Sequence, residues 1–224
     1  MAIIVQCTSI KLPPNGVVYT NKSNANKIRL AHIVCTYHRE QKIIKKNKLF
    51  ENYDDKDYKM IVVDNGNTIQ KSKSAVLLKS DNYGGSAGFA RGIIFAMETG
   101  FTHILLNDDD AEVNPESIFR LMSFLRLLKD KEICIAGIMF DENNPNIVYE
   151  SGSSVIRGRL EPYNRGLDLS KIDNIPTIMK ENKILYSNWT LFCMPVSVPK
   201  NNGLPLPVFV REDDVEYGLR SKMK

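Results

Sequence analysis

Short apolar runs rich in Ile, Val and Leu alternate with helical patterns along the chain from Ile28 onward. Runs that are apolar at nearly every position are typical of strands buried on both faces of a parallel sheet. The alternation therefore predicts an α/β fold with a mostly parallel central sheet flanked by helices. Strands are expected at Leu30–Thr36, Met60–Asp64, Ala75–Lys79, His103–Asn107 and Ile133–Met139.

Two helices have clear start or stop signals. Asn114 is a good N-cap and Pro115 suits the first helical position. A second helix is expected from Ser86 to Thr99, because Gly100 behind it tolerates the left-handed turn that ends many helices. Apolar residues follow Pro115 at the spacing of a core-facing stripe, at Ile118, Leu121, Met122, Leu125 and Leu128.

The remaining parts of the chain are less regular. Residues 1–27 lack clear periodicity, so we expect an N-terminal arm there and a single domain over residues 28–224. After Met139, Asn, Gly, Ser and Pro become frequent. This predicts a small antiparallel or irregular part, with hairpin strands at Ile147–Glu150 and Ser154–Arg157.

Composition narrows the classes of protein and partner. The 224 residues include 30 basic and 26 acidic side chains, so no single sign of charge dominates and nucleic acid is not the expected partner. The longest apolar run, Ile133–Phe140, is far shorter than the roughly 20 residues that span a bilayer. The N-terminus has no signal-peptide pattern, so we expect a cytoplasmic protein that is at most peripheral to the membrane.

Cysteines and basic residues refine this expectation. Cys7, Cys35, Cys134 and Cys193 have no close pairing, which favours reduced thiols and fits a cytoplasmic location. The densest basic stretch, Arg39–Lys48, holds five positive charges. We interpret it as the solvated face of a helix, with contact to anionic lipid at the inner membrane face as the alternative.

The strongest chemical feature is the sequence Asn107-Asp108-Asp109-Asp110 directly after a predicted strand. Ligands of open α/β sheets bind beyond the carboxyl ends of the strands. If the extended geometry persists, Asp108 and Asp110 project to one side, where two carboxylates suit Mn²⁺ or Mg²⁺ and, through the metal, a diphosphate. The alternative is a solvated acidic loop at a helix N-terminus, where carboxylates are favourable anyway.

A glycine-rich segment, Asn82–Gly92, lies between a predicted strand and a predicted helix. Glycines there allow close approach of a ligand, and the helix N-terminus offers unpaired amides to a negative group. A dinucleotide-binding fingerprint is one alternative, but Tyr83 stands where its first glycine belongs and the segment follows the third predicted strand. A purely structural tight turn is the other alternative.

Two further strand ends are polar, at Thr36-Tyr37 and at Asp64-Asn65-Gly66. Asp64 has the chemistry to accept a hydrogen bond from a nucleobase, although Asp-Asn-Gly is also a good turn sequence. With Asn82 and the aspartate triplet, four successive strands place polar groups at one edge of the sheet, which predicts a nucleotide pocket.

The last feature is the acidic segment Glu212-Asp213-Asp214-Val215-Glu216, at the start of a predicted helix. The apolar segment Leu204–Val210 precedes it and argues for partial burial. Burial raises the pKa of an aspartate and makes it a better proton acceptor from a sugar hydroxyl.

The order of these motifs, from Thr36-Tyr37 to Glu212-Asp213-Asp214, resembles the family 2 glycosyltransferases of the GT-A fold. The branch it resembles is that of bacterial galactofuranosyltransferases and rhamnosyltransferases. The resemblance covers residues 28–220, and its most specific parts are Asn82–Arg91 and Asp213–Arg220. A nucleotidyltransferase would share the sheet and the carboxylates, but it would have a basic glycine-rich loop on the first strand, which His32–Arg39 lacks.

The resemblance implies a role for each matching residue. The donor-binding residues would be Thr36, Asp64, Asn82, Gly84, Gly85, Arg91, Asp108 and Asp109. Asp108 and Asp110 would hold the metal, and Asp109 would lie near the ribose or the donor sugar. Asp214 would be the general base, and Asp213 would contact the acceptor. Trp189 would be an aromatic platform for the acceptor, with packing in the core as the alternative.

The resemblance also implies an activity. The expected function is inverting transfer of a galactofuranose-like or rhamnose-like sugar from a UDP- or dTDP-sugar to a glycan or lipid-linked acceptor in cell-surface polysaccharide synthesis. Family members usually continue past this acidic motif, whereas the present sequence ends at Lys224. The alternative is therefore a truncated domain, either an incomplete catalytic fragment or a module that binds nucleotide sugars without activity.

Overall fold

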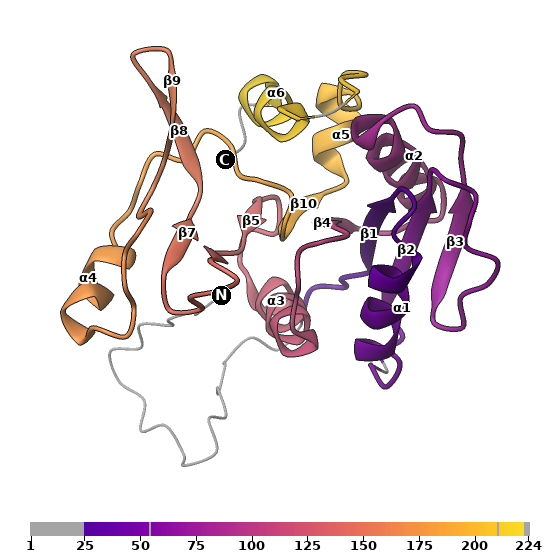
Figure 1. Cartoon of the computed structure of the whole chain (residues 1–224), viewed down its shortest axis with the longest axis horizontal. Coiled ribbons are helices and arrows are strands. Elements are labelled where there is room, and N and C mark those ends of the chain that lie inside the picture. Colours follow the sequence, from indigo (N-terminus) through magenta and orange to yellow (C-terminus); the bar gives the residue numbers. More distant parts are fainter. Residues whose placement is uncertain (1–24, 54, 210, 222–224) are drawn as a thin grey trace.

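A six-stranded sheet forms the centre of the computed structural model, which describes residues 25–53, 55–209 and 211–221 (Figure 1). Its order is β3-β2-β1-β4-β10-β5; the first four strands pair in parallel, and β10 pairs antiparallel with both β4 and β5. The predicted α/β fold with a mostly parallel sheet is therefore confirmed. The strands are β1 (Leu30–Thr36), β2 (Tyr58–Asp64), β3 (Ala75–Lys79), β4 (His103–Asp108), β5 (Ile135–Ala136) and β10 (Phe192–Pro195).

Helices cover both faces of this sheet, and the core is split accordingly. The residues of β1 alternate between the two faces: Leu30 and Val34 pack with α1 (Glu40–Leu49) and α3 (Pro115–Leu127). Ala31 and Ile33 pack instead with α2 (Gly85–Glu98). Because both faces of the parallel strands are covered, nearly every position in them is apolar, as the sequence pattern indicated.

The two predicted helices are confirmed at their ends. The Asn114 side chain accepts a hydrogen bond from the Glu116 amide at 2.9 Å, and α3 starts at Pro115. Gly100, just after α2, has a left-handed φ of 77°. Within α2, a Cβ on Gly88 would lie 2.2 Å from the Cys35 sulfur, so this glycine allows the helix to lie close to β1.

The predicted fifth strand is wrong in extent. Residues 133–139 contribute only β5 and the first residue of β6 (Met139–Phe140), with Gly137 between them. The Gly137 amide donates to the Leu191 carbonyl at 2.8 Å, and β6 leaves the central sheet for a separate ladder. A close backbone approach at a glycine thus divides an apolar run that the pattern alone shows as continuous.

Beyond β6 the structure is antiparallel, as predicted, but the hairpin partners differ. β7 (Val148–Glu150) pairs with β6, while β8 (Ser153–Ile156) pairs with β9 (Arg159–Pro162). Arg157 and Gly158 both have positive φ, the geometry of a tight two-residue hairpin, and they turn the chain back after β8. Figure 1 shows this part standing apart from the parallel strands.

Short helices complete the fold, and no described helix is long and apolar enough to cross a membrane. Of the predicted N-terminal arm, residues 1–24 lie outside the described part, but Asn26 donates to the carbonyls of Leu125 and Leu128 at the end of α3. Cys35, Cys134 and Cys193 are free thiols, as expected, and Cys7 lies outside the described residues. The remaining helices are η1 (Ile172–Asn174), α4 (Ile175–Ile178), α5 (Ser197–Asn202) and α6 (Asp213–Ser221).

Candidate active site

The aspartate triplet forms a turn at the carboxyl end of β4. The strand ends at Asp108, and the Ala111 amide donates to the Asp108 carbonyl at 3.2 Å. The expected alternation of side chains therefore stops at Asp108. One guanidinium nitrogen of Arg39 lies 2.7 Å from Asp109 Oδ1 and 2.8 Å from Asp110 Oδ2, so these two carboxylates share a partner. We refer to residues 108–111 as the acidic turn.

The basic stretch that we interpreted as a solvated face supports this turn. Arg39 binds two of its carboxylates, and Lys45 forms an ion pair with Glu112 just beyond it. Lys46 is only 6% exposed, and its ammonium donates to Asn107 Oδ1 and to the carbonyls of Asp108 and Ala111. Burial lowers the pKa of Lys46 to about 8 against the opposing effect of nearby carboxylates. The solvated-face interpretation is therefore wrong for Lys46, while Arg39 and Lys45 are exposed as expected.

The second acidic segment begins α6. Asp214 Oδ1 accepts from the Val215 amide at 2.9 Å, and Asp213 Oδ1 accepts from the Asp214 amide at 3.2 Å. Burial raises the pKa of Asp214 to about 6, with Asp213 and Glu150 adding repulsion. The direction is the one expected for a carboxylate that is to accept a proton near neutral pH.

The two acidic segments lie within electrostatic reach of each other, although about 100 residues separate them. Burial raises the pKa of Asp108 to about 7, and repulsion from Asp110, Asp213 and Asp214 adds to this effect. The Cys35 thiol lies within the electrostatic reach of both segments, and burial together with Asp109, Asp108 and Asp213 raises its pKa to about 12. The carboxylates at the end of β4 thus interact electrostatically with those at the start of α6, and their convergence on one nucleotide pocket stays a prediction.

This arrangement fits a divalent cation in its chemistry. Burial, with added repulsion from neighbouring carboxylates, raises the pKa of Asp108, so a cation beside it would relieve an unfavourable charge. Mg²⁺ is commonly held by one or two protein carboxylates plus phosphate oxygens, so Asp108 and Asp110 would suffice only together with a ligand. Within the described ranges, no group of three or more His, Cys, Asp or Glu is arranged to hold a metal by itself.

The glycine-rich segment binds protein backbone at the point where we expected a ligand. The Gly85 amide donates to the Phe209 carbonyl at 3.0 Å, and the Ser86 hydroxyl donates to the Leu206 carbonyl. Gly84 has φ 91°, and a Cβ there would lie 2.1 Å from the Phe209 oxygen. The segment that precedes α6 thus contacts the N-terminus of α2, as the structural-turn alternative expects, and binding of an anionic group there stays a prediction. Asn82 shapes the same turn by accepting from the Gly84 amide at 3.1 Å.

Thr36 and Asp64 are buried and already have partners. Thr36 donates to Asp109 Oδ2 at 2.8 Å, which ties the end of β1 to the acidic turn. Asp64 accepts from the amides of Gly66 at 3.0 Å and Ile69 at 2.7 Å, so it closes the turn after β2. Their expected contacts with a nucleoside stay a prediction, and each would need a rearrangement or a second hydrogen bond.

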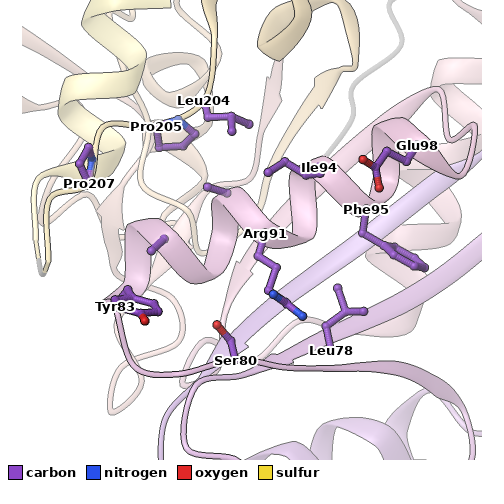
Figure 2. A pocket seen from close by; sticks show the side chains of 12 residues that line it. Leu78, Ser80, Tyr83, Arg91, Ile94, Phe95, Glu98, Leu204, Pro205 and Pro207 are labelled. Atoms are coloured by element: carbon purple, nitrogen blue, oxygen red, sulfur yellow. The ribbon is translucent and has the colours of Figure 1, made fainter.

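Arg91 lies apart from the carboxylates. It is exposed and lines a cavity of about 580 Å³ between the outer face of α2, the end of β3 and residues 204–207. Figure 2 shows its side chain directed toward Leu78 and Ser80, away from Pro205 and Pro207. No other predicted site residue lines this cavity. The structure therefore does not place Arg91 with the rest of the expected donor site.

Trp189 belongs to the core. It is 3% exposed, and its ring meets Phe89 edge-on at a centroid distance of 5.0 Å and Tyr217 at 6.2 Å. Its carbonyl accepts from the Asp108 amide at 2.9 Å. The expected acceptor platform is corrected to the packing alternative, because this buried ring presents no open face to a sugar.

Sequence reasoning missed the polar network beneath the acidic turn. Asn107 is fully buried, and its Nδ2 donates to the Thr190 carbonyl at 2.6 Å. His32 Nε2 lies 3.1 Å from Asn107 Oδ1, and Nδ1 lies 2.7 Å from the Tyr58 hydroxyl. Burial, with Lys46 nearby, lowers the pKa of His32 to about 3, so the ring is neutral and donates through Nε2. One signal was available, since Lys46 follows the buried Ile43 by three positions on the same helix face.

Comparison with known proteins agrees with this fold and motif order. No family model matches the chain. It is 29% identical over 155 residues to the galactofuranosyltransferase GlfT2 of Mycolicibacterium smegmatis, an alignment that covers 62% of this chain and 24% of that protein. GlfT2 of Mycobacterium tuberculosis is 28% identical over 157 residues, with the same coverage. The chain thus spans about a quarter of the length of these relatives.

Solved structures share the fold at low sequence identity. Residues 1–349 of S. aureus TarS superpose with a TM-score of 0.53 at 13% identity, covering 87% of this chain and 55% of that one. The mannosyltransferase PcManGT from Pyrobaculum calidifontis, in complex with GDP-Man and Mn²⁺, gives 0.52 at 13% identity, covering 87% and 52%. Together with the similarity to GlfT2, these matches confirm the GT-A fold and the resemblance to family 2 glycosyltransferases.

Proposed function

We propose that this chain is the catalytic domain of an inverting, metal-dependent glycosyltransferase. Its donor would be a UDP- or dTDP-sugar of the galactofuranose or rhamnose kind, and its acceptor a hydroxyl of a glycan or of a lipid-linked sugar. The similarity to galactofuranosyltransferases supports the activity. Because the chain spans about a quarter of those proteins, the activity of the whole protein is part of this proposal.

One observation carries the proposal: carboxylates from β4 and from α6 lie within electrostatic reach of one another. The repulsion that Asp213 and Asp214 exert on Asp108 requires the three side chains to lie within electrostatic reach. Transfer of a sugar with inversion needs a base on one side of the reacting carbon and stabilisation of the departing diphosphate on the other. In this proposal α6 supplies the base and the acidic turn stabilises the diphosphate.

The residues of the chain have distinct parts in this scheme. Asp214 accepts the proton of the acceptor hydroxyl, whose oxygen then attacks the anomeric carbon while the bond to the diphosphate breaks. Asp213, beside it, orients the acceptor. Asp108 and Asp110 would hold Mn²⁺ or Mg²⁺, which supplies electrostatic stabilisation of the diphosphate when bound. A direct displacement of this kind inverts the configuration at the anomeric carbon.

Donor binding is assigned to the polar ends of the parallel strands. Thr36, Asp64 and Asp109 would surround the nucleoside, and Asn82, Gly84 and Gly85 would shape the neighbouring wall. A solved TarS structure contains UDP, and its TM-score with this chain is 0.53 at 12% identity. This supports a nucleotide as a ligand of this fold. Arg91 is left out of this set because it lines the cavity on the outer side of α2.

The decisive experiment compares Asp214→Asn with Asp173→Asn, an exposed aspartate of η1. Transfer from UDP-galactofuranose and dTDP-rhamnose is followed by nucleotide release, and UDP binding with Mn²⁺ by calorimetry. We expect Asp214→Asn to lower kcat by about 10²–10⁴-fold while UDP affinity and folding are retained. Asp173→Asn should match the unmodified protein.

Each outcome has a defined meaning. Turnover by Asp214→Asn equal to that of the unmodified protein removes Asp214 from the role of base. Nucleotide binding without transfer by the unmodified chain favours the alternative, an incomplete fragment or a nucleotide-sugar binding module. Absence of both binding and transfer refutes the proposal.

A further inference from the structure

We propose that Lys46 is a positioning residue that fixes the acidic turn from behind and thereby sets where Asp108 and Asp110 present their carboxylates. The inference rests on the proposed function in that it assigns these carboxylates to a cation and a diphosphate. Lys46 belongs to α1, more than 60 residues before the turn, so no local sequence constraint links the two.

The Lys46 ammonium contacts both ends of the acidic turn. Lys46 Nζ lies 2.9 Å from the Asp108 carbonyl and 2.9 Å from the Ala111 carbonyl, and it also donates to Asn107 Oδ1. These acceptors stand at the beginning and at the end of the acidic turn. An ammonium has three donors, and all three are used here. A single buried group therefore holds both ends of the turn together.

Lys46 is itself held in place. It is 6% exposed, and Ile43, one turn earlier on the same face of α1, is 1% exposed in the core. Its acceptor Asn107 is fixed by the Thr190 carbonyl and by His32. A satisfied buried network of this kind is rigid, because each member loses a hydrogen bond if another moves.

The choice of acceptors separates Lys46 from Arg39. Arg39 binds the carboxylates of Asp109 and Asp110 themselves, and its side chain is 47% exposed. It therefore competes with any cation for the same oxygens. Lys46 binds backbone carbonyls and an amide oxygen, so its positive charge offsets the repulsion in the turn and leaves the carboxylates free. It can remain in place when a cation and a diphosphate bind.

The test compares Lys46→Met with Lys45→Met. Both substitutions remove one positive charge next to the turn, but Lys45 is 67% exposed and pairs with Glu112 outside it. Amide hydrogen exchange of residues 108–111 and calorimetric binding of UDP with Mn²⁺ are measured for each. For Lys46→Met we expect exchange in the turn to be at least ~10-fold faster and UDP–Mn²⁺ affinity to be at least ~10-fold weaker. Lys45→Met should stay within about twofold of the unmodified protein in both measurements.

A merely structural role would lower thermal stability and leave affinity and turn exchange in the folded protein unchanged, and that result overturns the inference. Should Lys46→Met fail to fold, Lys46→Arg takes its place, since it keeps the charge but exchanges the three-way ammonium for a planar fork. The inference then requires UDP–Mn²⁺ affinity at least ~3-fold weaker than for Lys45→Met, with faster exchange in the turn. Equal values overturn it.

Failure of the proposed function gives a different pattern. If the unmodified protein binds no UDP with Mn²⁺ while Lys46→Met still accelerates exchange in residues 108–111, the positioning contact is real and the transferase proposal is refuted. If the unmodified protein binds UDP and the Lys46 and Lys45 variants behave alike, the inference alone is refuted.

Discussion

The two acidic segments of the site have similar sequences but are stabilised in different ways. The acidic turn has cationic neighbours, since Arg39 binds its carboxylates and Lys46 its backbone. Asp213 and Asp214 accept from backbone amides at the start of α6. Among the described residues, no cationic side chain forms an ion pair or hydrogen bond with either of them.

This difference suggests a division of labour. Positive charge around the acidic turn stabilises clustered carboxylates that would otherwise repel one another, which suits a place for a cation and a diphosphate. Burial raises the pKa of both Asp108, to about 7, and Asp214, to about 6. At Asp108 repulsion from four neighbouring carboxylates adds to burial, which a bound cation would offset, whereas Asp214 has no close cation and suits a proton acceptor. The same residue type is thus adapted to two tasks by its surroundings.

The largest effect that separates the segments is on ligand binding. We expect Asp108→Asn to weaken UDP–Mn²⁺ affinity at least roughly 10-fold and to lower transfer at least about 100-fold, because it removes one of two hard oxygen ligands. Asp214→Asn should lower transfer alone. Calorimetry and nucleotide release on both variants test this division. Equal loss of UDP affinity in both would abolish the distinction between the segments.

The second effect is on pH dependence. Asp214 must be ionised to accept a proton, and its pKa is raised to about 6. Transfer measured at subsaturating acceptor should therefore fall by about tenfold per pH unit below that value and level off above it. A profile that stays flat from pH 5 to 8 in stable protein would contradict the assignment. Asp173→Asn serves as the control, and its profile should match that of the unmodified protein.

The third effect is on stability, where Asp214→Asn should raise the free energy of unfolding although it lowers transfer. The pKa of Asp214 is higher in the folded chain than its reference value of 3.8, so the folded state binds the proton more tightly and the ionised form costs stability above about pH 6. We expect Asp214→Asn to increase the free energy of unfolding by about 1 kcal/mol at pH 7.5, roughly 2–4 °C in Tm. The gain should vanish below pH 4. Thermal melts at both pH values decide this, and a loss of stability at pH 7.5 would contradict it.

The smallest expected effect is at Arg39. Arg39→Met should lower the free energy of unfolding by less than about 1 kcal/mol, because the side chain is 47% exposed and water screens its ion pairs. Arg120→Met, which removes an exposed helix ion pair with Glu116, is the matched control and should cost less. Melts at low and high salt provide the measurement, and the difference between the variants should shrink as salt rises.

The sequence predicts the parallel sheet well, because strands that are buried on both faces are apolar at nearly every position. β1 and β3 match the expected ranges at both ends, and β2 and β4 differ only in length. The same pattern could not locate the break at Gly137, since that break depends on the Leu191 carbonyl about 50 residues later. Pairing of β8 with β9 similarly depends on the turn at Arg157 and Gly158 rather than on the apolar pattern.

The candidate site was predictable in its acidic residues but not in their partners. Carboxylates that follow a strand or begin a helix are recognisable from the sequence alone. The structure places those of the acidic turn within electrostatic reach of those at the start of α6. The partners come from distant segments of the chain, namely Arg39, Lys46 and Phe209. Charge alone therefore assigned the basic helix to solvent, and glycine content alone assigned the N-terminus of α2 to a ligand. Trp189 shows the same limit, because an aromatic residue in a polar stretch has no sequence mark that distinguishes a core position from a binding platform.

The contact between Gly84 and the Phe209 carbonyl limits how the two segments that it joins can vary in sequence. Any side chain at position 84 would collide with that oxygen, and the segment behind it leads directly into the helix that carries Asp213 and Asp214. A sequence change at the N-terminus of α2 would therefore displace the segment before α6, and a change in that segment would displace the N-terminus of α2. A chimera that imports a new acceptor segment from another transferase would have to take over the spacing between residues 206 and 213, or exchange both parts as a unit.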